Sequence, residues 1–176
     1  MRITAVVAAL ILFSVGAASA QEWDEFISLK DGFRINFPGQ PKETAGTWTS
    51  QMNYTLPMRV YSAEKGRERY SITVVDYSGI EQMGIERAKT CPPGNQNCRA
   101  NAPPELGPGY SHHDARGALV YATFRVLQRA SQLNFLTWKW RDMVEVPLIQ
   151  VTTADQSRTH GVLGMNAHRL YLVTAH

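Results

Sequence analysis

The sequence predicts an α+β domain, in which a mainly antiparallel β-sheet carries one principal helix packed on it. Apolar and polar residues alternate along most of the chain, as is typical of strands with one buried face. Residues 78–89 have helical spacing instead. The predicted strands come before and after this helix rather than alternating with helices, which favours an antiparallel sheet over a parallel one.

Four segments ahead of the helix are expected to be strands, at residues 33–37, 48–56, 58–62 and 69–77. The last two form a predicted hairpin that turns at Lys65 and Gly66. In its second arm, Ile72 and Val74 face one side of the sheet and Thr73 faces the other, since successive side chains of a strand point to opposite faces.

The helix has recognisable signals at both ends. Ser78 followed by Glu81 predicts a capping box, in which two free backbone N–H groups are satisfied. Apolar or small residues then recur at helical spacing, at Ile80, Met83, Gly84 and Ala88. Pro92 and Pro93 prevent the helix from continuing.

The second half of the chain is expected to return to strands. The predicted strands are residues 118–128, 134–142 and 144–153, with a final pair on either side of Asn166 and Ala167. Between the helix and these strands, residues 91–117 are rich in Pro, Gly and Asn and are expected to be the least regular part of the domain.

The N-terminus has the three parts of a cleavable, Sec-type signal peptide over residues 1–20. Arg2 supplies the positive charge, residues 3–15 are uncharged and mostly apolar, and Ala18 and Ala20 are small residues at the positions that signal peptidase inspects. The apolar run is shorter than the about 20 residues of a membrane span. We therefore expect a periplasmic or secreted bacterial protein, with one domain over residues 21–176 and no membrane span after cleavage.

Two cysteines, Cys91 and Cys98, are predicted to form a disulfide. Thiols this close together in an oxidising compartment usually pair. Closing so short a ring contributes about 2.5 kcal/mol in the chain-entropy account. A metal site needs closer spacing and further ligands, and a redox pair is usually C-x-x-C, so both are disfavoured.

Composition argues against nucleic-acid binding. Without Arg2 the chain has 17 Lys and Arg against 15 Asp and Glu, and no run of cations concentrates the charge. No nucleophile elbow, phosphate-binding loop or dinucleotide-binding fingerprint occurs, so no catalytic residue, cofactor or cofactor-binding residue is predicted.

His112, His113 and Asp114 are the one cluster of potential metal ligands. Adjacent residues of an extended chain point apart, so this cluster needs a distant third ligand, for which His160, His168 and His176 are the candidates. A solvated loop cap is the favoured interpretation, and no metal site is predicted.

The predicted strands 118–128 and 134–142 suggest a partner-binding surface. If the two strands pair as a hairpin, one face carries Leu136, Trp138 and Trp140, a stripe for which a place in the core is the favoured interpretation and a ligand platform is the alternative. The opposite face is then basic, and its residues Tyr121, Arg125, Lys139 and Arg141 are the candidate surface for an acidic protein segment or an anionic envelope polymer.

Several segments are similar to exported bacterial proteins of uncharacterised function. They are DGFRINFPGQPKE, SITVVDYS, ERAKTCPPGNQNC and GALVYATF, which together sample most of the mature chain. The opening and the order of elements resemble, more loosely, the PsbP/Mog1-like fold, whose members mostly act as binding or assembly factors. This chain departs from that fold at its end, since RLYLVTAH is a strand where the fold adds a helix.

The sequence thus predicts a non-catalytic binding or assembly domain, with a protein or an anionic envelope component as its partner. The alternative is a secreted hydrolase or metal-dependent enzyme that uses the His112–His113 loop.

Overall fold

The computed structural model describes residues 23–90, 110–141 and 144–176. Its elements, in chain order, are β1 (Asp24–Ser28), β2 (Phe33–Phe37), β3 (Lys42–Thr49), β4 (Thr55–Lys65), β5 (Glu68–Asp76), α1 (Ile80–Lys89), α2 (Tyr110–Leu127), β6 (Gln132–Arg141), β7 (Val144–Thr152), β8 (Arg158–Asn166) and β9 (Arg169–Ala175). The predicted α+β class is confirmed.

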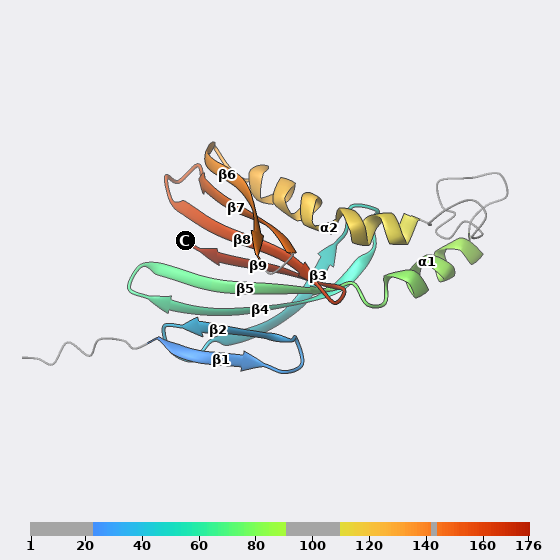
Figure 1. Ribbon diagram of the computed structural model, residues 1–176, viewed down its shortest axis with the longest axis horizontal. Coiled ribbons are helices and arrows are strands. Elements are labelled where there is room, and N and C mark those ends of the chain that lie inside the picture. Colours follow the sequence, from blue (N-terminus) through green and yellow to red (C-terminus); the bar gives the residue numbers. More distant parts are fainter. Residues whose placement is uncertain (1–22, 91–109, 142–143) are drawn as a thin grey trace, which may run out of the picture.

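The strands form two antiparallel sheets (Figure 1). The larger sheet has seven strands in the order β3-β4-β5-β9-β8-β7-β6, and β1 and β2 form a separate hairpin. The C-terminal strand β9 lies in the middle, between β5 and β8. The predicted hairpins are confirmed at the β4–β5 turn, where Gly66 has a positive φ, and at the β8–β9 turn. The strand β1 was not predicted, and the predicted strand at residues 48–56 is wrong, because β3 ends at Thr49, β4 begins at Thr55 and a turn lies between them.

One face of the large sheet packs against α2. The buried side chains of this helix-side core come from the sheet, from α1 and α2, and from the segments beside them. They are Trp48, Tyr54, Leu56, Val75, Tyr77, Ile80, Ala118, Ala122, Ile149, Val151, Leu163, Leu170 and Leu172. Ala118 and Ala122 are one helical turn apart, and their small side chains let the helix axis approach the strands closely.

The opposite face packs against the β1–β2 hairpin. Phe37 of the hairpin is buried with Tyr61, Ala63, Ile72 and Val74 of the sheet. Val74 and Val75 are neighbours in β5 and belong to different cores, as the alternation of a strand requires. The molecule therefore has three layers: hairpin, sheet and helix.

The predicted helix over residues 78–89 is confirmed as α1, but its predicted capping box is wrong. The N-cap is Gly79, and no side chain caps the helix. The carboxylate of Asp76 accepts a hydrogen bond from the backbone N–H of Ser78 at 2.9 Å, and so fixes the residues ahead of the helix instead. Further along α1, the guanidinium of Arg87 lies 3.6 Å from the centre of the Tyr54 ring and donates to the carbonyls of Met52 and Asn53.

The prediction of a strand at residues 118–128 is wrong, and so is the loop prediction for residues 110–117. Both segments belong to the helix α2. The segment contains Val, Tyr, Thr and Phe, which favour strands, and its residues also alternate. Tertiary packing overrides this preference, because a helix places Asp114, Ala118 and Ala122 on one buried stripe and leaves Val120 and Phe124 exposed. The hydroxyl of Thr123 donates to the carbonyl of Leu119 within the same helix.

The predicted signal peptide at residues 1–20 and the predicted disulfide between Cys91 and Cys98 lie outside the described residues. No helix in the described ranges is long and apolar enough to cross a membrane.

Candidate ligand-binding cavity

A cavity of about 450 Å³ lies between α2 and the half of the large sheet nearest β3. Its roof is the C-terminal end of α2, where Ala122, Arg125 and Val126 share one face because they are three or four residues apart, together with Arg129 in the turn after the helix. Trp48 of β3 and Met58 and Val60 of β4 form a side wall.

The floor of the cavity is a group of hydroxyl side chains on the helix-side face of the sheet, at Ser71, Thr73, Thr159 and Thr174. They come from three neighbouring strands, because β9 lies between β5 and β8. The hydroxyls of Ser71 and Thr174 are hydrogen-bonded to each other at 2.8 Å. A hydroxyl both donates and accepts, so this floor can bind a polar group of either kind.

The two arginines give the roof a positive charge. The Arg125 guanidinium lies 4.5 Å from the centre of the Trp48 ring and 5.9 Å from that of Tyr121, and its Nη1 donates to the carbonyl of Thr49 at 3.3 Å. Neither Arg125 nor Arg129 forms an ion pair with any acidic residue in the described ranges. A cation held in place by aromatic rings and left without a carboxylate is suited to bind an anionic group.

His176 also lines the cavity. Its Nδ1 lies 2.7 Å from the hydroxyl of Thr159, and its backbone pairs with Arg69. Burial and the positive charge of Arg69 lower the pKa of His176 below its usual value, whereas Asp155 acts in the opposite sense. The imidazole is therefore neutral at pH 7.

The predicted hairpin behind the partner surface is wrong. β6 pairs with β7, and residues 118–128 form α2, so Tyr121 and Arg125 lie on the helix side of the sheet. The register places positions 139 and 141 with Leu148 on the opposite face. The Tyr121 ring lies 5.9 Å from the guanidinium of Arg125 in its own helix. Lys139 is exposed, and the side chain of Arg141 is not among those that the structure describes. A partner-binding role for Tyr121, Arg125, Lys139 and Arg141 stays a prediction.

The loop proposed for His112 and His113 is the first turn of α2. His113 is exposed, whereas Asp114 is fully buried and accepts a hydrogen bond from the hydroxyl of Ser50. Burial raises the pKa of Asp114 above its usual value, and the bond from Ser50 partly opposes this. Within the described ranges, no group of three or more His, Cys, Asp or Glu side chains is placed to hold a metal ion.

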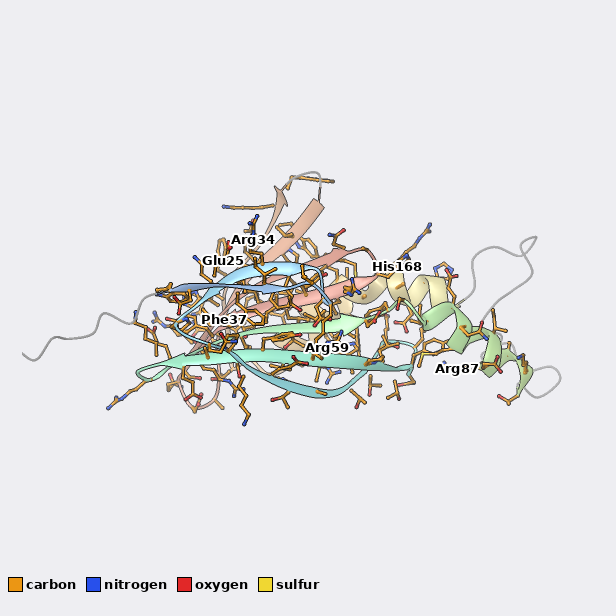
Figure 2. All side chains as sticks on the ribbon, turned by 90° about the horizontal axis from the view of Figure 1, so that it is seen from below. Glu25, Arg34, Phe37, Arg59, Arg87 and His168 are labelled. Carbon is orange, nitrogen blue, oxygen red and sulfur yellow. The ribbon has the colours of Figure 1, made fainter. Side chains whose placement is uncertain are left out.

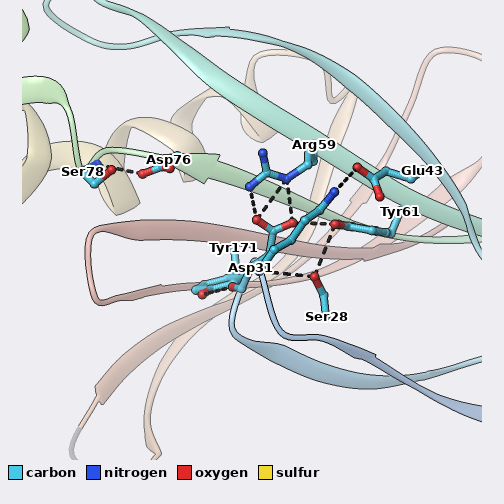
Figure 3. Close-up of polar contacts among 9 residues, drawn as sticks. Ser28, Asp31, Glu43, Arg59, Tyr61, Asp76, Ser78 and Tyr171 are labelled. Carbon is cyan, nitrogen blue, oxygen red and sulfur yellow. Dashed lines mark hydrogen bonds and ion pairs between the residues drawn. The ribbon is translucent and has the colours of Figure 1, made fainter.

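A second polar cluster, centred on Asp31, has a structural role (Figure 3). Asp31 is fully buried, and its carboxylate accepts two hydrogen bonds from Nε of Arg59, at 2.8 and 3.0 Å, and another from Nη2. The hydroxyl of Tyr61 donates to the same carboxylate at 2.6 Å, and that of Tyr171 donates to the Asp31 carbonyl at 2.7 Å. These contacts join the β1–β2 turn to β4 and β9.

The charge on Asp31 is maintained by this cluster. Burial opposes ionisation, but the hydrogen bonds from Arg59 and Tyr61 hold the pKa of Asp31 below its usual value. Both oxygens of the carboxylate have donors, so the carboxylate is satisfied within the cluster.

Comparison with known proteins adds no assignment: no family model, curated protein or solved structure matches this chain. The cavity itself was not predicted from the sequence. Its signal was the polar face of β5, where Ser71 and Thr73 alternate with Ile72 and Val74, but the helix that makes a cavity of this face was predicted as a strand.

Proposed function

We propose that this protein is a non-catalytic binding domain, and that the cavity beneath α2 holds a small amphipathic molecule with an acidic group. One observation carries the proposal: two arginines without carboxylate partners in the described ranges line the same cavity as a group of hydroxyls and a wall of apolar side chains. Sites for small ligands are commonly concave, mostly apolar and provided with a few placed polar groups.

The charges define where the acidic group sits. Arg125 is held against Trp48, and Arg129 lies in the turn that follows α2. A carboxylate or phosphate between them and the hydroxyl floor would receive charge-assisted hydrogen bonds, which are about twice as strong as neutral ones. No acidic side chain of the described ranges lines the cavity to oppose this.

The remaining walls define the rest of the ligand. Met58, Val60, Val126 and Leu172 are apolar and lie beside the hydroxyl floor. A volume of about 450 Å³ is within the usual range for small-molecule sites. The proposed ligand is therefore an organic acid with a short hydrocarbon portion.

Calorimetric titration with decanoate tests this function, and decanol is the matched control because it has the same chain without the charge. Decanoate should bind and decanol should bind at least tenfold more weakly. Arg129→Gln should weaken decanoate binding about tenfold, which corresponds to the loss of one charge-assisted hydrogen bond. Arg34→Gln, a change on the hairpin at the opposite face, should have no effect (Figure 2). Equal binding of the two compounds, or none of either, contradicts the proposal.

The proposal also places the domain in the periplasm or outside the cell, with support from the tripartite pattern of residues 1–20. Mass spectrometry of the exported protein should give a mature N-terminus at Gln21. Alkylation without reductant should leave Cys91 and Cys98 unmodified. A retained N-terminus, or a labelled thiol, would contradict these two parts.

A further inference from the structure

The large sheet ends in two edges of different character. β3 forms one edge and β6 the other. Along β3 the residues are polar or small, and Trp48 is the one large apolar side chain, which is buried. Polar and charged residues are a common protection against unwanted pairing at a sheet edge.

The β6 edge lacks this protection. Four of its large apolar side chains are substantially exposed, with fractions of 48% for Leu133, 49% for Phe135, 39% for Trp138 and 75% for Trp140. Within the described ranges β6 pairs on its β7 side only, so the N–H and C=O groups along its outer side are unpaired. An edge that is both apolar and open is suited to add another strand.

We propose that β6 pairs antiparallel with β6 of a second copy of this chain, with Trp138 on the two-fold axis. This inference is independent of the cavity and of its ligand. A two-fold pairing covers the β6 edge of both copies at once and closes the assembly as a dimer. A strand added from another protein would instead leave its own outer edge open.

Charge favours this register over two of its alternatives. In an antiparallel pair centred on Trp138, Lys139 lies opposite Thr137 of the second copy, and Trp140 lies opposite Leu136. Position 141 lies opposite Phe135. Centring the pair on Lys139 would oppose two lysines, and centring it on Trp140 would oppose Lys139 and position 141, which are both basic. Like charges directly opposite each other destabilise a strand pair.

The area available predicts a weak dimer. Large aromatic side chains have about 150–250 Å² to bury, so the exposed fractions along β6 correspond to roughly 400 Å² per chain. The pair would bury roughly 800 Å² from side chains, below the about 1,200 Å² of a standard stable interface. Dissociation in the micromolar range or weaker is expected.

Sedimentation of the exported protein over a wide concentration range tests the dimer. Two variants at one site, Thr137→Glu and Thr137→Lys, are matched in size. Thr137→Glu places a negative charge next to Lys139 of the second copy, and Thr137→Lys places a positive charge there. Each contact occurs twice in the dimer, so Thr137→Glu should tighten association about fivefold and Thr137→Lys should weaken it about fivefold. Trp140→Ser, at the most exposed of the four side chains, should weaken it at least tenfold without loss of circular dichroism signal.

Three results would overturn the proposal. One is a monomer at every concentration for both the wild type and Thr137→Glu. Another is a dimer that is insensitive to all three substitutions. The third is a protein that does not self-associate but binds an acidic peptide, with Thr137→Lys binding it more tightly than Thr137→Glu. That result would assign the β6 edge to an acidic partner.

Discussion

Asp31→Ala tests whether the Asp31 cluster holds the β1–β2 hairpin on the sheet. The substitution removes a fully buried carboxylate and leaves the Arg59 guanidinium and the Tyr61 hydroxyl without their acceptor. Breaking a fully buried ion pair costs about 3–5 kcal/mol. The side chain of Arg59 is 26% exposed, so water can replace part of the loss. We therefore expect the free energy of unfolding to fall by about 2–3 kcal/mol.

Urea denaturation followed by circular dichroism measures this loss. The control is Lys30→Ala at the neighbouring position, because Lys30 pairs with Glu43 at the surface and its removal should leave the urea midpoint nearly unchanged. In hydrogen exchange, Asp31→Ala should release the amides of β1 and β2 before those of β5. The double variant Asp31→Leu/Arg59→Met should recover much of the stability, since no buried charge is then left unpaired. If Asp31→Ala behaves like Lys30→Ala, the hairpin is held by its apolar side chains alone.

Three further changes follow from the same structure. Because the pKa of Asp31 is lowered in the folded state, its contribution is complete above about pH 4 and is lost as the pH falls through the lowered pKa, so acid should destabilise the wild type more steeply than Asp31→Ala. Gly161→Ala should cost about 1–3 kcal/mol in urea denaturation, because its Cβ would lie 2.8 Å from Cγ2 of Ile149, whereas Gly164→Ala, with 3.8 Å to Val146, should be tolerated. His168→Gly should raise the thermal midpoint and stabilise the protein by about 1 kcal/mol, since His168 has a φ of 62° in the β8–β9 turn (Figure 2); an unchanged midpoint would show that the turn is not strained.

The strands near the centre of the large sheet could be predicted because their two faces differ. In β5 the residues Ile72 and Val74 pack under the hairpin and Ser71 and Thr73 line the cavity, so alternation marks the strand clearly. The β4–β5 turn also had a local signal, since Gly66 has the positive φ that tight hairpins require, whereas Ala167 and His168 in the β8–β9 turn adopt positive φ without a glycine. Such signals depend on neighbouring residues, which a sequence displays directly.

The edge strand β3 and the helix α2 could not be predicted in this way. β3 buries one of its eight residues, so it has no alternation to detect. In α2, the apolar residues satisfy both a strand pattern and a helix pattern. What distinguishes the helix is that Ala118 and Ala122 lie together on its buried side. That depends on the shape of the sheet below, which is built from strands on both sides of α2 in the chain. The cavity has the same origin and was missed for the same reason.

The width of the sheet explains why a cavity exists beneath α2. Strands lie about 4.8 Å apart, so seven strands span roughly 29 Å, whereas a helix with its side chains covers about 10–12 Å. One helix therefore cannot cover this face. α2 packs on β7, β8 and β9, and the space beside it, above β4 and β5, must be filled by side chains, water or a ligand. In this chain the positions that border the space include Arg125, Arg129 and a group of hydroxyls, where Leu or Phe would have closed it. These residues give up apolar burial that the fold could have had, and the proposed binding of an acidic ligand would account for their presence.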